Sequence, residues 1–154
     1  MKKLLSLLVL TVVVATGCKS QSGSAEAKKL AKSDVTYEYS AFTRGTRLHV
    51  VINNFGIGAT KGHPGEKAPE TFKTIAQNDR NALLEETSKL NLDKFETVEV
   101  PSKKHQFDGA MAANFKITVD GKTYQTPTFD HGNPPAEIKA LVEKIIELSE
   151  LEKE

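Results

Sequence analysis

Acidic and imidazole side chains are expected to gather at the open end of one predicted hairpin. Asp108 precedes the Asp120-Gly121 pair, and Asp130 and His131 follow it at a similar distance along the chain. Because Asp-Gly between alternating residues is a strong signal for a two-residue hairpin turn, both sides should emerge at the same end of the hairpin. Asp108, Asp130 and His131 are therefore the candidate binding residues, with His105 close by.

Two carboxylates and an imidazole offer the oxygen and nitrogen ligands that a divalent metal ion accepts. Their spacing matches no recognised ligand pattern, however. Aspartate beside glycine commonly forms turns through bonds to its own backbone. We therefore expect Asp130 to cap the turn and His131 to bond a carbonyl group, with no metal ligand and no catalytic residue among them. A metal site formed by Asp108, Asp130 and His131 is the alternative.

Motifs for catalysis and nucleotide binding do not occur in this sequence. There is no Gly-x-Ser-x-Gly segment, and the paired glutamates are expected on solvated helix faces. The glycine-rich stretch 56–62 lacks the Gly-Lys-Ser/Thr order that opens a phosphate-binding helix, so 54–69 is predicted to be a mobile loop. The net charge of +1 shows no excess of basic residues of the kind that nucleic-acid binding requires. We expect no enzyme activity and no cofactor.

Cys18 is the single cysteine of the chain, and its surroundings predict covalent chemistry of another kind. Two lysines follow Met1, an apolar run covers residues 4–14, and Ala15-Thr16-Gly17 leads into Cys18. A cationic start, a short apolar run and small residues before a cleavage point are typical of a secretory signal. The run is shorter than the roughly 20 residues that span a bilayer.

The end of this segment resembles the lipobox of bacterial lipoproteins. That resemblance implies a signal peptide over residues 1–17, cleavage before Cys18 and acylation of the Cys18 thiol and amino terminus. Lys19 resembles the residue found in lipoproteins sent to the outer membrane, so an extracytoplasmic, lipid-anchored location in the cell envelope is expected. Residues 18–33 are small, polar and basic and are predicted to be a flexible tether, followed by a single domain over 34–154.

The domain begins and ends with alternating or periodic segments. Residues 35–41 and 46–53 alternate with a period of two and predict a hairpin that turns at Arg44-Gly45. Residues 112–119 and 122–129 predict the second hairpin, with Pro127 at an edge position. A third strand is expected over 70–77, although a helical pattern is also visible there.

Two amphipathic helices are predicted to cover one face of these strands. The first begins at Asn78 or Asp79 and runs to about Leu90, and the second follows the Asn133 cap and two prolines. The expected fold is α+β: a two-layer sandwich in which an antiparallel sheet of four to five strands carries both helices on one face. The expected order is strand, strand, a possible third strand, helix, strand, strand, helix.

From residue 35 onward, the layout resembles small, uncharacterised bacterial envelope lipoproteins. The resemblance is carried by residues 107–110, by the Asp120-Gly121 hairpin and by residues 129–135 before the last helix. More distantly, the opening tyrosine strand with Arg44-Gly45 and the closing hairpin-to-proline-helix unit are similar to emfourin, an inhibitor of thermolysin-type metallopeptidases. The glycine-rich segment from Gly56 to Gly65 departs from that pattern.

These observations predict a lipid-anchored envelope lipoprotein that acts as a non-enzymatic binding module. Its expected contacts are the membrane, through acyl chains on Cys18, and a protein partner, with no role for nucleic acid. The alternative that the emfourin resemblance implies is an inhibitor of an extracytoplasmic metallopeptidase. A third hypothesis is a metal-binding lipoprotein.

Overall fold

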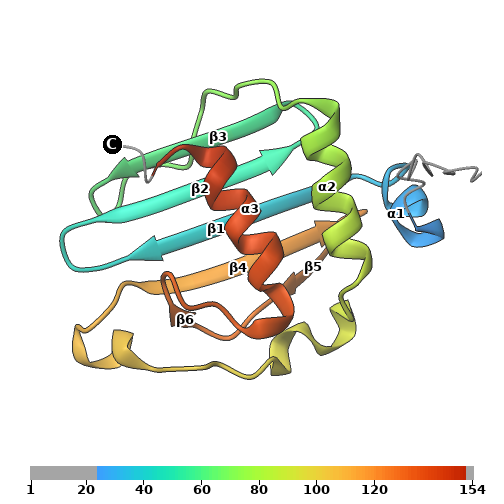
Figure 1. The fold of residues 1–154 in the computed structure, drawn as a ribbon. Coiled ribbons are helices and arrows are strands. Elements are labelled where there is room, and N and C mark those ends of the chain that lie inside the picture. The colour runs from blue at the N-terminus through green and yellow to red at the C-terminus, as the bar shows by residue number, and fades with distance from the viewer. Residues whose placement is uncertain (1–23, 152–154) are drawn as a thin grey trace, which may run out of the picture.

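An antiparallel sheet with helices on one face forms the body of the protein in the computed structural model, which describes residues 24–151 (Figure 1). The sheet order is β3-β2-β1-β4-β5, and β6 also pairs with β4. In chain order the elements are α1 (Ala25–Leu30), β1 (Val35–Phe42), β2 (Arg47–Asn53), β3 (Gly56–Gly62), α2 (Gln77–Ser88), η1 (Leu92–Thr97), η2 (Lys104–Phe107), β4 (Ala112–Val119), β5 (Lys122–Gln125), β6 (Phe129–Asp130), η3 (Ala136–Ile138) and α3 (Lys139–Ser149). The predicted α+β sandwich is confirmed.

Alternation along the strands separates a buried face from a solvated face. In β1 every second residue from Val35 to Ala41 is buried, and Tyr39 lies opposite Val50 of β2 and Phe115 of β4. Side chains that share a face of the sheet in this way form one apolar layer. Asp120 and Gly121 both have positive φ, 48° and 83°, as the predicted two-residue turn requires.

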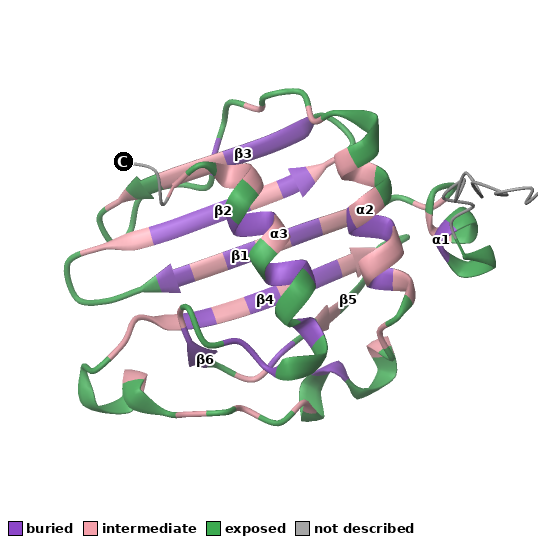
Figure 2. Ribbon diagram, viewed as in Figure 1, coloured by how far each residue is buried: buried purple, intermediate pink, exposed green. Residues whose placement is uncertain are grey.

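Helices α2 and α3 supply the second layer (Figures 1 and 2). Leu83 and Thr87 of α2 are 1% exposed, and Leu141 and Ile145 of α3 are equally buried. Residues spaced three to four apart fall on one side of a helix, so each helix presents a single apolar stripe to the sheet. Phe95 reaches the same core from η1.

The third strand is not where the sequence predicts it. Strand β3 covers Gly56–Gly62, within the segment that we expected to be a mobile loop, and residues 70–77 form no strand apart from a bridge between Lys73 and Ile57. The backbone N–H and C=O groups of Ile57 and Lys73 are hydrogen-bonded to each other at 2.8 Å. The prediction of a loop is therefore wrong for residues 56–62, and the prediction of a strand over 70–77 is wrong.

Close approach of the chain, rather than flexibility, explains the glycines of β3. A Cβ atom at Gly58 would lie 2.7 Å from the Cβ of Pro69, and one at Gly56 would lie 2.1 Å from the carbonyl oxygen of Lys73. Only glycine allows two backbone segments to come so near. The segment that follows β3 thus packs across this edge strand. The glycines that favoured a loop prediction are instead needed for this close packing.

Helix α1 occupies part of the predicted tether. Ser24 caps the helix by accepting a hydrogen bond from the backbone of Ala27, and Ala27 is buried. The backbone N–H of Ser24 also donates to Glu85 of α2 at 3.1 Å. Residues 25–30 are therefore a helix that contacts α2 and not a flexible linker.

The predictions for the signal peptide and for acylation of Cys18 fall outside the described residues. Between residues 24 and 151, no helix has both the length and the apolar character needed to cross a bilayer.

Candidate functional site

The second hairpin brings both aspartate motifs to one end of the sheet. Asp130 of β6 pairs with Ala112 at the start of β4, and Asp108 lies just before that strand. The β1–β2 turn and η2 lie at this same end, whereas α1 lies at the opposite end (Figure 1). The expected juxtaposition of the two motifs is therefore confirmed, and the orientation of each side chain decides what the site can do.

Asp130 is buried and is held by a complete set of donors. The Ser102 hydroxyl and the Lys104 backbone N–H, at 2.9 Å, donate to one carboxylate oxygen. The backbone N–H of His105, at 2.8 Å, and its Nδ1, at 2.6 Å, donate to the other. Asn133 Nδ2 in turn donates to the Ser102 hydroxyl at 2.8 Å. This cluster fastens η2 to β6.

The electrostatics of Asp130 follow from these contacts. Burial raises the pKa of its carboxyl group, but hydrogen bonds from Ser102 and from the backbone of residues 104 and 105 outweigh burial, so the pKa lies well below its usual range. A carboxylate that is ionised and surrounded by donors is a poor proton acceptor. Asp130 therefore acts as a structural anchor for the loop, which extends the predicted capping role.

Asp108 faces solvent on the outside of the same loop. It has a left-handed backbone, with φ of 56°, at the end of η2. Its carboxylate accepts a hydrogen bond from the Arg44 guanidinium at 3.2 Å, and the two side chains are 76% and 91% exposed. Exposed pairs of this kind contribute little to stability, about 0–1 kcal/mol. Both charges remain accessible to a partner.

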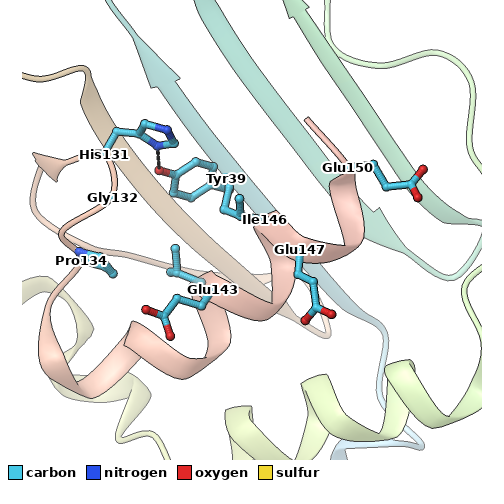
Figure 3. A pocket seen from close by; sticks show the side chains of 9 residues that line it. Tyr39, His131, Gly132, Pro134, Glu143, Ile146, Glu147 and Glu150 are labelled. Carbon is cyan, nitrogen blue, oxygen red and sulfur yellow. Dashed lines mark hydrogen bonds between the residues drawn. The ribbon is translucent and has the colours of Figure 1, made fainter. Parts of the chain in front are cut away.

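His131 points to the helix side of the sheet. Its Nδ1 is hydrogen-bonded to the hydroxyl group of Tyr39 at 2.6 Å (Figure 3). The pair lies at a hollow of about 390 Å³ that we call the α3 groove, lined also by Pro134, Val142, Glu143, Ile146, Glu147 and Glu150. His131 does bond a carbonyl group, because its backbone N–H donates to the carbonyl oxygen of Met111 at 3.0 Å, while its ring contacts the Tyr39 hydroxyl.

The three predicted residues thus share one end of the sheet but not one site. Asp130 bonds residues 102–105, His131 bonds Tyr39, and Asp108 bonds Arg44. Within residues 24–151, no group of three or more histidine, cysteine, aspartate or glutamate side chains is arranged to hold a metal ion. The geometry gives the metal hypothesis no support.

A second hollow, of about 420 Å³, lies between the β1–β2 turn and η2. We call it the Phe42 hollow; its lining includes Phe42, Arg44, His105, Asp108 and Ala112. Phe42 is 46% exposed, and Phe107, which directly precedes Asp108, is 84% exposed. Exposed aromatic side chains beside paired charges are the composition that protein-binding surfaces favour.

Three residues form contacts at this end of the molecule that the sequence pattern did not predict. Tyr39 lies within the alternating segment 35–41, Arg44 lies in a predicted turn, and Ser102 lies between the predicted elements. A phenol hydroxyl that is buried needs a polar partner, and that rule alone could have flagged Tyr39. Nothing in the local sequence relates Ser102 to Asp130, since their contact depends on the tertiary fold.

His49 of β2 makes a second buried histidine contact, with only 5% of the residue exposed. Its Nε2 donates to Glu38 at 3.0 Å across the solvated face of the sheet. That hydrogen bond is the main reason why the pKa of Glu38 is lowered. The Nδ1 atom of His49 has no hydrogen-bond partner among the described residues.

Comparison of the chain with protein-family models, with curated proteins and with solved structures finds no significant match. The fold class therefore comes from the structure itself: an antiparallel α+β sandwich with hollows on two sides of its hairpin end. The resemblances to envelope lipoproteins and to emfourin stay predictions.

Proposed function

We propose that this chain is a lipid-anchored protein of the bacterial envelope whose domain binds a protein partner without enzymatic activity. The observation that carries the proposal is the exposure of two aromatic side chains: Phe42, which lines the Phe42 hollow, and Phe107, which directly precedes Asp108 of that lining. Large aromatic side chains are usually buried in folded proteins, and exposed ones beside a hollow commonly serve as anchors for a partner. Arg44 and Asp108 supply charges of both signs at the rim.

The position of the hollow supports this role for an anchored protein. The chain enters the described fold at α1, and Figure 1 places the β1–β2 turn and η2 at the far end of the sheet. If Cys18 carries the acyl chains, the Phe42 hollow lies at the end of the sheet opposite to α1, which is the described element nearest to Cys18 along the chain. A partner could then reach it without meeting the bilayer.

The anchor is tested by labelling growing cells with an alkyne analogue of palmitate and separating membranes from the soluble fraction. We expect the wild-type protein to be labelled and membrane-bound, and Cys18→Ser to lose the label and leave the membrane. Labelling that persists in Cys18→Ser contradicts attachment at this residue.

The docking surface is tested by quantitative co-purification from membranes. The double variant Phe42→Ser plus Phe107→Ser removes the exposed ring that lines the hollow and the exposed ring next to Asp108, and it should lose the partner. Phe55→Ser is the matched control, because Phe55 is 82% exposed but lies in the β2–β3 turn at the other end of the sheet. Equal losses in the two variants, or no loss in either, contradict the assignment.

A further inference from the structure

The α3 groove combines an apolar floor with an acidic rim. Val142 and Ile146, buried at 4% and 9% exposure, and buried Pro134 form the floor. The exposed Glu143, Glu147 and Glu150 line the helix side; Figure 3 shows Glu143 and Glu147 on successive turns of α3 and Glu150 just after its end. Tyr39 and His131 close the opposite wall through their hydrogen bond.

Residues 142–150 carry more negative than positive charge, with Glu143, Glu147 and Glu150 against Lys144. Glu143 and Glu147 are four residues apart, and like charges at that spacing repel each other. The last turn contains no basic residue, although the C-terminal end of a helix favours cations. A positive group in the groove would relieve both conflicts.

The lysines that contact these glutamates do not prevent them from binding another cation. A carboxylate oxygen of Glu143 lies 3.8 Å from Lys139 Nζ, and one of Glu147 lies 3.5 Å from Lys144 Nζ. Lys144 has a closer partner in Asp79, at 2.9 Å. Glu150 lies 3.6 Å from exposed Lys73. The Lys139–Glu143 pair is long and exposed, so either side chain can exchange it for another partner. None of these lysines lines the groove.

We propose that the α3 groove binds a basic segment of a protein partner. A lysine or arginine of that segment would lay its methylene groups on Val142 and Ile146 and bring its cation to Glu143 and Glu147, as long basic side chains do on mixed surfaces. Apolar neighbours in the segment would contact Pro134. This site is separate from the Phe42 hollow and goes beyond the proposed function.

Fluorescence anisotropy with the full chain carrying Cys18→Ser tests the proposal. The probes are labelled pentapeptides of sequence Leu-Lys-Leu-Lys-Leu and its Gln and Glu counterparts, which keep the leucines and change only the charge. We expect saturable binding of the lysine peptide alone, weakened when salt rises from about 50 mM to about 500 mM. Binding of the glutamine peptide with equal affinity would overturn the charge assignment, and no saturation of the lysine peptide at roughly 1 mM would overturn the site.

Matched variants locate the binding. Glu143→Gln plus Glu147→Gln should weaken the lysine peptide by about fivefold or more. Glu96→Gln plus Glu99→Gln removes two exposed charges elsewhere and should leave the affinity within about twofold. Equal weakening in both pairs contradicts the groove. Displacement of the lysine peptide by spermidine at equal concentration would assign the groove to free polyamines and overturn a protein partner.

Discussion

The segments Phe107-Asp108 and Phe129-Asp130 look alike in sequence and behave in opposite ways. Phe107 is 84% exposed, while Phe129 is 0% exposed. The Asp108 side chain is 76% exposed, and that of Asp130 is 3% exposed. Both segments lie at the same end of the sheet, so the difference does not come from their position along the molecule.

Strand pairing separates the two motifs. Phe129 lies opposite Ala113 in β4, which directs its ring into the core against Tyr39, 6.3 Å away between ring centroids. Phe107 ends a short 3-10 helix that forms no ladder, so nothing directs its ring inward. One motif therefore holds the fold together, and its counterpart is free to contact a partner.

The largest contrast is expected between the two phenylalanines. Phe129→Ala removes a fully buried ring and should lower the free energy of unfolding by about 3–5 kcal/mol. Phe107→Ala should change it by less than about 0.5 kcal/mol, because the ring is already in water. Urea unfolding followed by circular dichroism measures both. Similar values for the two variants would remove the distinction between the motifs.

Substituting the buried Asp130 should also destabilise the protein more than substituting the exposed Asp108, although by less than the loss of the Phe129 ring. Asp130→Asn replaces an acceptor of four hydrogen bonds with an amide and should lower Tm by roughly 5–15 °C. Asp108→Asn should shift Tm by less than about 2 °C, since it loses only an exposed pair. Thermal melts at neutral pH compare them, and a larger shift for Asp108→Asn would contradict the assignment.

The pH dependence of Tm should also distinguish Asp130 from Asp108. The pKa of Asp130 is lower in the folded protein than in the unfolded chain. The stabilisation is therefore complete above the ordinary aspartate pKa of about 4 and is lost as the pH falls through the folded value. Tm measured from neutral to strongly acidic pH should fall less steeply for Asp130→Asn than for wild type. Asp108→Asn serves as the control and should follow the wild-type curve.

A small effect on stability is also expected for Arg44→Ala. Its guanidinium pairs with Asp108 at 3.2 Å on an exposed surface, so the free energy of unfolding should change by less than about 1 kcal/mol. If the Phe42 hollow binds a partner, the same variant should reduce partner recovery, because it removes a charge from the rim. A large stability loss without any change in recovery would show that Arg44 serves the fold alone.

Local patterns sufficed for much of the fold because the relevant signals are local. Alternation located both hairpins, Asp120-Gly121 located one turn, and helical periodicity identified the buried faces of α2 and α3. Strand β3 could not be recognised in this way. Its glycines allow residues 69–73 to pack closely against the strand. Such packing between separate segments produces no periodic pattern in the sequence.

The candidate site was predictable in place but not in detail. Hairpin geometry brought Asp108 and Asp130 to one end, whereas the partner of each depends on loops that pack from elsewhere. Arg44 comes from the β1–β2 turn and Ser102 from the segment before η2. Whether an aspartate faces a donor set or solvent is decided by that packing, which sequence spacing alone does not encode.

Site-specific photocrosslinking tests the central claim most directly. A photoreactive phenylalanine placed at residue 107 of the membrane-anchored protein should give one discrete adduct in whole cells, and Phe42→Ser should abolish it. The same photoreactive residue at Phe55 is the control and should give no such adduct. An adduct that forms equally from both positions, or one that survives Phe42→Ser, would contradict docking at the Phe42 hollow.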